Sequence, residues 1–226
     1  MAEKFKEQAI IIRQEEIADD IYSMWLRTEE IAAHAKAGQF VSVYCNEGSR
    51  LLPRPISICE IDKEAKRLRL VYRVTGEKTG TKQFSELKAG DFVPVIGPLG
   101  NGFSYEKAEG KKVFLMGGGI GVPPILELAK QMQCEEKQIV VGYRDAHTFL
   151  KEEFEQNRTL YISTEDGSVG TKGNVMDAIR ENAKEFLATI IKLKPAAAKG
   201  TYIKSIYLSS TMSPGIKVDP KSVEEN

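Results

Sequence analysis

The stretch RPISICEIDKEAKRLRLVYRVTGEKTGTKQFSEL, residues 54–87, decides the fold of the first part of the chain, because two strand patterns flank a charged turn. Within it, the side chains of residues 67–74 alternate between the two faces of a strand. One face is apolar and carries Leu68, Leu70, Tyr72 and Val74. The opposite face carries Arg67, Arg69 and Arg73. This alternation predicts a strand with one face on a hydrophobic core.

Similar short strand patterns surround this stretch up to about residue 100, separated by glycine, proline and charged turns. The segments are AIIIRQ, DIYSMWLRT, GQFVSVYC, RPISICEI and DFVPVIG. About six antiparallel strands of this length suit a small closed barrel, which leaves no exposed sheet edge. We therefore expect a β-barrel over residues 1–104.

The pattern changes after GPLGNGF, residues 97–103. KKVFLMGGG is a compact apolar run that ends in glycines, and the helical stretch PPILELAKQM follows it. A strand QIVVGYR, a helical piece around FLKEEFEQ and a strand TLYIST then follow at the spacing of βαβ units. We expect a parallel-sheet nucleotide-binding α/β domain over residues 105–181. A long helix is predicted to begin near Asn174 and to end before Pro195.

The composition excludes several classes of protein. The 226 residues include 32 basic and 32 acidic side chains, so no net charge favours nucleic acid. No stretch approaches the ~20 apolar residues of a membrane span, and the first apolar run is too short for a signal peptide. We therefore expect a cytoplasmic protein. The cysteines Cys45, Cys59 and Cys134 are far apart, which predicts neither a disulfide framework nor a four-thiolate metal site.

The first motif that carries chemistry is RPISI, residues 54–58. Pro55 fixes φ and removes a backbone donor, so the strand begins at a bend. Arg54 can pair with a phosphate and Ser57 can hydrogen-bond a heterocycle, with Ile56 between them facing inward. The same residues also fit a bent edge strand with a surface arginine.

The second motif places Gly80 and Thr81 between a strand and a short helical pattern that starts near Lys82. Backbone donors at a helix start suit a pyrophosphate, although Gly-Thr before a helix is also a common capping arrangement. Upstream on the strand, Tyr72 offers a ring for stacking and Arg73 a second cation.

The third motif is MGGGIGVPPILELAKQM, in which four glycines end a strand and let the backbone approach a ligand. They are Gly117, Gly118, Gly119 and Gly121. Pro123 and Pro124 suit the first helical turn but cannot donate, so any phosphate bonds must come from residues up to Val122. The spacing is not G-x-G-x-x-G, and a structural strand-to-helix turn is the alternative.

In this order, with AGQF, GPLGNGF, GYRD and TEDGSVGTKG between and after them, the motifs resemble the electron-transfer subunit of NAD-linked bacterial dihydroorotate dehydrogenase over residues 1 to about 181. The resemblance implies a ferredoxin-reductase-like FAD barrel followed by an NAD-binding α/β domain. It implies that FAD is held by Arg54, Pro55, Ile56, Ser57, Val71, Tyr72, Arg73, Gly80 and Thr81. It implies that NAD faces Gly117, Gly118, Gly119 and Gly121. The partner would be an FMN-containing dihydroorotate dehydrogenase catalytic subunit in pyrimidine biosynthesis.

The same family implies a [2Fe-2S] cluster on four clustered cysteines near the C-terminus, and no cysteine follows Cys134 here. Its last nucleotide-domain strands are absent too, so we expect a truncated α/β domain and no metal site. Residues 182–226 instead resemble the C-terminal end of the ribosomal protein of the large-subunit lateral stalk, which predicts a chimeric sequence. An RNA-binding ribosomal fragment, through lysines such as Lys192 and Lys204, and a non-functional gene fusion are the alternatives.

For the dinucleotide, Glu165 and Asp166 near the expected ribose side would repel an extra phosphate. This favours NAD over NADP. Arg144, after the second strand of the α/β domain, could pair with that phosphate instead.

Overall fold

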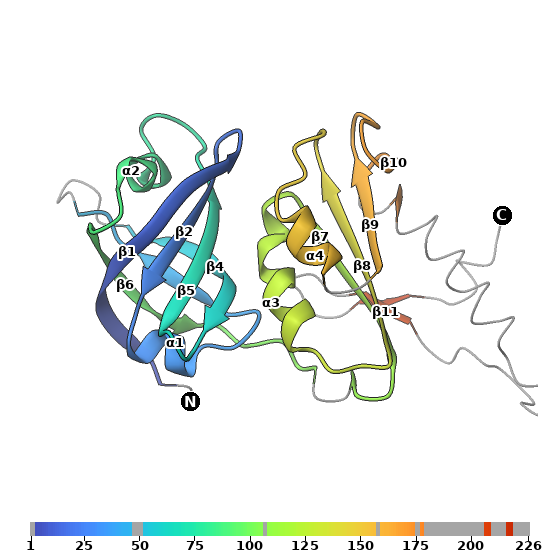
Figure 1. Ribbon diagram of the computed structural model, residues 1–226, viewed down its shortest axis with the longest axis horizontal. Coiled ribbons are helices and arrows are strands. Elements are labelled where there is room, and N and C mark those ends of the chain that lie inside the picture. The colour runs from blue at the N-terminus through green and yellow to red at the C-terminus, as the bar shows by residue number, and fades with distance from the viewer. Residues whose placement is uncertain are drawn as a thin grey trace, which may run out of the picture.

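The structure is a computed structural model that describes residues 3–46, 52–105, 108–156, 159–174, 177–178, 206–208 and 216–218. Six antiparallel strands form a closed barrel in the order β1-β2-β5-β4-β3-β6 (Figure 1). The strands are β1 (Phe5–Ala18), β2 (Ile21–Arg27), β3 (Phe40–Val43), β4 (Arg54–Asp62), β5 (Arg67–Arg73) and β6 (Phe92–Leu99). The barrel predicted from the alternating segments is confirmed.

The barrel interior is filled by the apolar side of each strand. On β5, Leu68, Leu70 and Tyr72 belong to this core, as the alternation predicts. Two short helices, α1 (Glu30–His34) and α2 (Gly80–Glu86), lie outside the strands. Helix α2 begins at Gly80, two residues before the predicted start at Lys82, because Thr79 caps it by accepting a hydrogen bond from the Lys82 backbone N–H.

The second part is an α/β unit with a parallel sheet in the order β10-β9-β8-β7. Its strands are β7 (Lys112–Gly118), β8 (Glu136–Tyr143), β9 (Thr159–Thr164) and β10 (Thr171–Lys172). Between them lie the 3-10 turn η2 (Gly119–Gly121), α3 (Pro123–Gln131) and α4 (Lys151–Glu155). The fold class, a β-barrel followed by a parallel-sheet α/β domain, is therefore confirmed.

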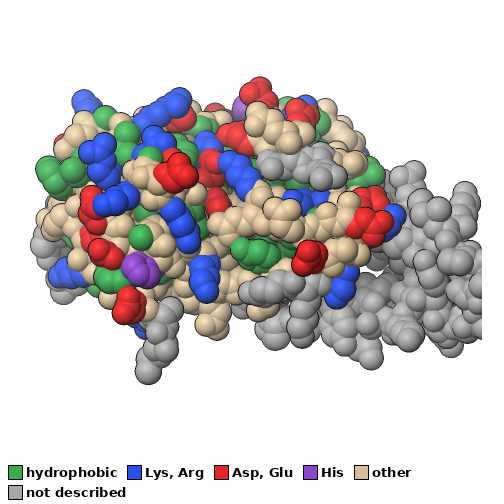
Figure 2. Space-filling model, turned by 60° about the horizontal axis from the view of Figure 1, so that its bottom comes forward, with side chains coloured by type: hydrophobic (Ala, Val, Ile, Leu, Met, Phe, Trp, Pro, Cys, Tyr) green, Lys and Arg blue, Asp and Glu red, His purple; other side chains and the backbone are tan. Residues whose placement is uncertain are grey.

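Helices α3 and α4 lie on the side of the sheet that faces the barrel (Figure 1). Helix α3 packs on β4, and one apolar cluster joins barrel residues such as Val71 and Cys59 to sheet and helix residues such as Leu126 and Ile139. The barrel and the α/β unit therefore share a packed interface. Positive and negative side chains are interspersed over the face seen in Figure 2, in keeping with the balanced charge of the sequence.

Most of the C-terminal prediction lies outside the described residues. This applies to most of the long helix after Asn174 and to most of the ribosomal-type segment 182–226. Within that segment the structure describes β11 (Ile206–Leu208) and β12 (Ile216–Val218), which pair with each other as an antiparallel ladder. The boundaries proposed for the three domains stay predictions. Among the described residues, no helix is long and apolar enough to cross a membrane.

Candidate functional site

The first two sequence motifs meet at one end of the barrel. Arg54 opens β4 and Gly80 opens α2, and a Cβ atom on Gly80 would lie 3.0 Å from Arg54 Nε and 3.0 Å from Cys45 Sγ. A side chain at position 80 would displace the guanidinium or the thiol, so glycine allows the helix start to lie this close to Arg54. Arg54 Nη1 also donates to the carbonyl oxygen of Leu52 at 3.2 Å. A cation and a helix start, 26 positions apart in the sequence, are therefore neighbours in the fold.

Hydrogen bonds hold both ends of α2 in place. Thr79 Oγ1 accepts from the backbone N–H of Lys82 at 3.2 Å and lies 3.0 Å from Thr81 Oγ1. At the other end of α2, Gln14 Nε2 donates to the carbonyl oxygens of Phe84 and Leu87 at 2.8 and 2.7 Å. Apart from the Lys82 N–H that Thr79 caps, the N–H groups of a first helical turn have no acceptor within the helix and can receive an anion.

The predicted set on β5 divides between the two faces of the strand. Tyr72 is 3 % exposed, and its ring stacks on Tyr22 and meets Phe84 edge-on, with centroids 5.9 and 6.1 Å away. Its hydroxyl donates to Gln14 Oε1 at 3.0 Å. Burial raises the pKa of Tyr72. The ring is thus part of the barrel core, whereas Arg73 is exposed at the end of the strand.

The predicted set on β4 divides in the same way. Ile56 belongs to the barrel core and is 6 % exposed, as the sequence predicts. In the register with β3, Arg54 and Ile56 lie opposite Val43 and Val41, and Pro55 and Ser57 lie opposite Ser42 and Phe40. By strand alternation Arg54 and Ser57, three positions apart in the sequence, lie on opposite faces of β4, so the two polar groups do not share one face.

The glycine loop lies where β7 ends. A Cβ atom on Gly117 would lie 2.9 Å from the Gly121 carbonyl oxygen, so this position has no room for a side chain. Gly119 has φ +53°, and no atom comes within 4 Å of a Cβ placed on it. The loop therefore packs against the start of α3 at Gly117, whereas at Gly119 it borders open space. Gly118 is exposed and Gly121 half-buried. Pro123 and Pro124 occupy the first turn of α3, as predicted.

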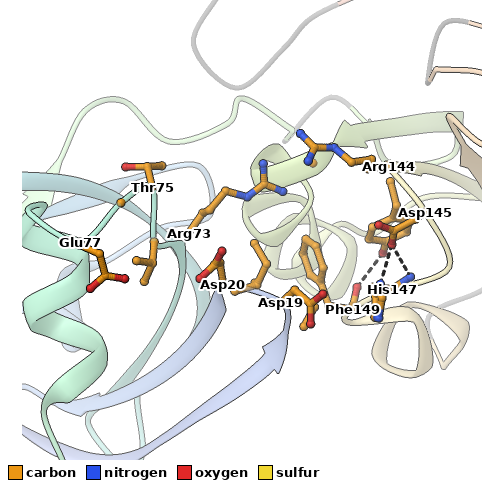
Figure 3. A pocket seen from close by; sticks show the side chains of 15 residues that line it. Asp19, Asp20, Arg73, Thr75, Glu77, Arg144, Asp145, His147 and Phe149 are labelled. Atoms are coloured by element: carbon orange, nitrogen blue, oxygen red, sulfur yellow. Dashed lines mark hydrogen bonds and ion pairs between the residues drawn. The ribbon is translucent and has the colours of Figure 1, made fainter.

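A cavity of about 650 Å³ lies between the barrel and the α/β unit (Figure 3). The barrel contributes the turn after β1 and the end of β5, residues 18–21 and 73–77. The α/β unit contributes Gly119 and the end of β8 with the loop that follows, residues 143–145, 147 and 149. Open α/β sheets bind ligands at the carboxyl ends of their strands, and this cavity has that position. In Figure 3 the side chains of Arg73 and Arg144 extend toward the space between the two units.

The charged groups around the cavity are arranged across the interface. His147 Nδ1 and the His147 backbone N–H both bond Asp145 Oδ1, at 2.8 and 2.9 Å. This hydrogen bonding and the charges of Asp145 and of Asp19 in the barrel raise the pKa of His147.

Hydrogen bonds from Ser168 to Asp166 lower the pKa of the Asp166 carboxyl group. Asp166 lies beside Arg144, since its backbone N–H donates to the Arg144 carbonyl oxygen at 3.3 Å.

The three cysteines lie on separate elements of the fold, and none of them forms a disulfide bond. Cys59 is fully buried at the interface, and burial strongly raises the pKa of its thiol. In the described part of the chain, no three histidine, cysteine, aspartate or glutamate side chains are grouped so that they could hold a metal ion.

Sequence reasoning missed the cavity residues contributed by turns. Asp19 and Asp20 form the tight turn between β1 and β2, and Asp145 and His147 follow the end of β8. The position of RDAH directly after a predicted parallel strand could have indicated Asp145 and His147, because that edge of a sheet binds ligands. No local pattern indicates that the β1–β2 turn reaches the same cavity.

Comparison with known proteins agrees with this geometry. A family model for the oxidoreductase FAD-binding domain matches residues 8–105. The chain is 42 % identical over 192 residues to the dihydroorotate dehydrogenase B (NAD(+)) electron transfer subunit of Streptococcus mutans, covering 82 % of this chain and 72 % of that one. It is 41 % identical to the subunit of the same name from a Geobacillus species, covering 80 % and 72 %.

Two solved structures share the fold. One, of an NADH-dependent reduced ferredoxin-NADP oxidoreductase described in work on flavin-based electron bifurcation, has a TM-score of 0.68 at 27 % identity. That match covers 80 % of this chain and 63 % of that one. A ferredoxin NADP+ reductase from Neisseria gonorrhoeae, with bound FAD and NADP, has a TM-score of 0.68 at 16 % identity, covering 81 % and 79 %.

Proposed function

This chain belongs to the family of dihydroorotate dehydrogenase B (NAD(+)) electron transfer subunits, and from this we propose its function. It is a flavin-dependent, NAD-linked oxidoreductase subunit that carries electrons between a dihydroorotate dehydrogenase catalytic subunit and NAD in pyrimidine biosynthesis. The catalytic partner contains FMN, and the location is cytoplasmic.

One observation carries this proposal. The cavity between the barrel and the α/β unit is lined both by Arg73, from the predicted FAD set, and by Gly119, from the predicted NAD set. The two sets are far apart in the sequence, and the family resemblance assigns them to different cofactors. A shared cavity is what two cofactors that exchange electrons directly require.

The residues present fit an FAD. Arg54 and the start of α2 offer a guanidinium and helix-start N–H groups side by side for the pyrophosphate, and a side chain at position 80 would fill this space. From there β5 leads to the cavity, which Arg73 lines, while Val71 is buried in the apolar cluster between the two units. A flavin, when bound, supplies exchange of one electron or of two, which connects a one-electron carrier with a nicotinamide.

The residues present also fit a nicotinamide dinucleotide at the carboxyl ends of β7 and β8. Gly119 leaves open space at the cavity, and its backbone can approach a ligand closely. Asp145 and Asp166 flank Arg144, and both carboxyl groups have a lowered pKa because of hydrogen bonds. They are anionic at neutral pH and disfavour the extra phosphate of NADP.

The residues present do not fit a [2Fe-2S] cluster. Such a cluster needs four protein ligands, usually thiolates, and this chain has three cysteines on separate elements. We therefore assign no cluster to this chain, and docking of the catalytic subunit stays part of the proposal.

The test is to purify the chain and measure flavin absorbance, then add NADH without oxygen. We expect stoichiometric FAD that bleaches with NADH. A colourless protein that does not take up added FAD would contradict the proposal.

The alternative of an RNA-binding ribosomal fragment, or of a gene fusion without function, depends on residues 182–226. The matches to electron transfer subunits favour the flavin function, and RNA binding by a chain without flavin would favour the alternative.

A further inference from the structure

The width of the cavity depends on how the barrel and the α/β unit are held together, because each contributes one wall. Asp19 and Arg73 belong to the barrel wall, whereas Gly119 and His147 belong to the α/β wall. A displacement of one unit changes the separation of groups bound on the two sides. Contacts that fix the interface can therefore act on a reaction in the cavity without touching it.

Glu127 on α3 makes such a contact. Its Oε2 atom accepts a hydrogen bond of 2.8 Å from the backbone N–H of Ile61 on β4, in the barrel. Its Oε1 atom accepts one of 2.5 Å from Gln131 Nε2, and Gln131 Oε1 accepts one of 2.7 Å from the Tyr105 hydroxyl. Tyr105 lies in the segment between β6 and β7, so this chain of hydrogen bonds joins the barrel, the connecting segment and α3.

Burial of the Glu127 carboxylate at the interface is energetically unfavourable, because it removes the charge from water. Glu127 is only 4 % exposed, and its neighbours on α3 at positions 125, 126, 128 and 129 are buried and apolar. Burial raises the pKa of Glu127, although the hydrogen bonds from Ile61 and Gln131 oppose this. An apolar side chain would fill the interface without this desolvation cost, but it could not accept a hydrogen bond from the barrel backbone. The hydrogen bond from Ile61 therefore fixes where Glu127 lies on β4, whereas an apolar side chain would contribute burial alone.

Helix α3 transmits this contact to the glycine loop. Glu127 lies one helical turn after Pro123, and η2 with Gly119 directly precedes α3. The backbone N–H of Val122 donates to the Gly119 carbonyl oxygen at 3.1 Å, which ties the loop to the helix start. An anchor at Glu127 therefore fixes the cavity wall at Gly119 through a short rigid segment.

A second group of contacts supports the same interface. Arg69 on β5, with a side chain 9 % exposed, bonds Glu60 at 2.7 Å and Glu153 of α4 at 3.1 Å. Glu60 also pairs with Lys130 of α3. Helices α3 and α4 are thus both bound to the barrel by ion pairs.

We propose that Glu127 is a positioning residue, which holds α3 and the Gly119 loop at a fixed place on β4 and so sets the distance between nicotinamide and flavin in the cavity. The inference rests on the proposed function of the site. A displacement of about 1 Å at a reacting pair can lower a rate about a hundredfold. Removal of the Glu127 carboxylate should therefore slow flavin reduction while FAD, held by the barrel, stays bound.

The test compares Glu127→Ala and Glu127→Gln with the parent chain, each loaded with FAD, in single-turnover bleaching by NADH at increasing concentration. We expect the limiting rate of Glu127→Ala to fall about tenfold or more, with FAD content unchanged. Glu127→Gln should stay within about twofold of the parent, because its amide oxygen can still accept from Ile61 and the Gln131 amide can turn over.

Val140→Ala is the control for a loss of stability alone, since Val140 is fully buried in the sheet but belongs to an apolar cluster separate from the one that joins the barrel. It should lower the thermal midpoint without slowing bleaching at saturating NADH. If Glu127→Ala does not fold, Gln131→Leu breaks the same chain of hydrogen bonds and should slow bleaching in the same direction.

Equal limiting rates in Glu127→Ala and the parent, or equal slowing in Glu127→Ala and Val140→Ala, would overturn the inference and leave the proposed function intact. Where Glu127→Ala does not fold, a limiting rate in Gln131→Leu equal to that of the parent would overturn it in the same way. A parent chain whose FAD does not bleach with NADH would overturn the proposed function, and the inference with it.

Discussion

Gly80 lies directly against Arg54: a Cβ atom added to Gly80 would come within 3.0 Å of Arg54 Nε and 3.3 Å of Arg54 Cγ. The guanidinium and the start of α2 therefore form one surface although they come from different motifs. This relationship gives separate roles to the two residues, since Arg54 supplies charge and Gly80 supplies the space for it.

Replacement of Arg54 by alanine should release FAD. A charge-assisted hydrogen bond to a phosphate contributes about 1.5 to 3 kcal/mol, so we expect FAD to bind about ten to a hundred times more weakly. Equilibrium titration of the flavin-free protein with FAD measures this. Arg27→Ala is the matched control, because Arg27 is an exposed barrel arginine outside the predicted site. Equal FAD affinity in the two variants would remove Arg54 from the site.

Replacement of Gly80 by alanine should weaken FAD binding without unfolding the barrel. The new methyl group would push on Arg54 and on Cys45 Sγ, each 3.0 Å away, and the flexible arginine side chain would move. Gly121→Ala is the comparison, because no atom lies within 4 Å of a Cβ at position 121. A Gly80→Ala protein with normal FAD affinity would show that Arg54 does not need its present position.

Much of this site follows from the sequence, and the reasons differ between residues. The core face of β5 could be predicted because its side chains alternate, and Leu68 and Leu70 are in the core. The other face was not predictable in this way. Arg69 is 7 % exposed because α4 and Glu153 cover it, and no pattern within the strand records a contact with a residue 84 positions later.

The start of α2 differs from its prediction by two residues, and the cause is local. The sequence places the helix start near Lys82, but Thr79 accepts from the Lys82 backbone N–H and thereby moves the start to Gly80. Gly80 and Thr81 are thus in the first turn rather than before it. The division of Arg54 and Ser57 between two faces follows from alternation, so the sequence contained that information.

The chain should use NADH in preference to NADPH. Asp166 is held by hydrogen bonds of 2.9 and 2.7 Å from Ser168, which keep its pKa low and its carboxylate charged. Asp166→Asn should therefore reduce the preference several-fold by removing repulsion near Arg144. Bleaching rates with both reduced nucleotides measure it. Faster bleaching of the parent chain by NADPH would show that Arg144 dominates instead.

The purified chain should contain no iron–sulfur cluster. A two-iron cluster needs four ligands, usually thiolates, while burial strongly raises the pKa of the Cys59 thiol and so disfavours its thiolate. Cys45 follows β3 and Cys134 follows α3, so the other two thiols belong to different parts of the fold. Analysis of iron and acid-labile sulfide checks this. Stoichiometric amounts of both would contradict the ligand count.

His147 should titrate above its usual pKa of about 6.5, because its charged form is stabilised from both sides of the cavity. The hydrogen bond to Asp145 is the largest cause, followed by the charges of Asp145 and of Asp19 across the interface. Asp20, Arg73, Glu77 and Arg144 complete the charged lining of the cavity. A raised pKa in the folded state means that the stabilising contribution is complete below the unfolded pKa and is lost as the pH rises through the folded value.

Two measurements test the raised pKa of His147. In NMR titrations, with the two histidines assigned by a His34→Gln variant, the His147 midpoint should lie above 6.5 and should fall more in Asp145→Asn than in Asp19→Asn. The difference in thermal midpoint between the parent and Asp145→Asn should be largest in mildly acidic solution and should shrink as His147 loses its proton. A His147 midpoint unchanged in Asp145→Asn would mean that the hydrogen bond to Asp145 does not stabilise the charged imidazole.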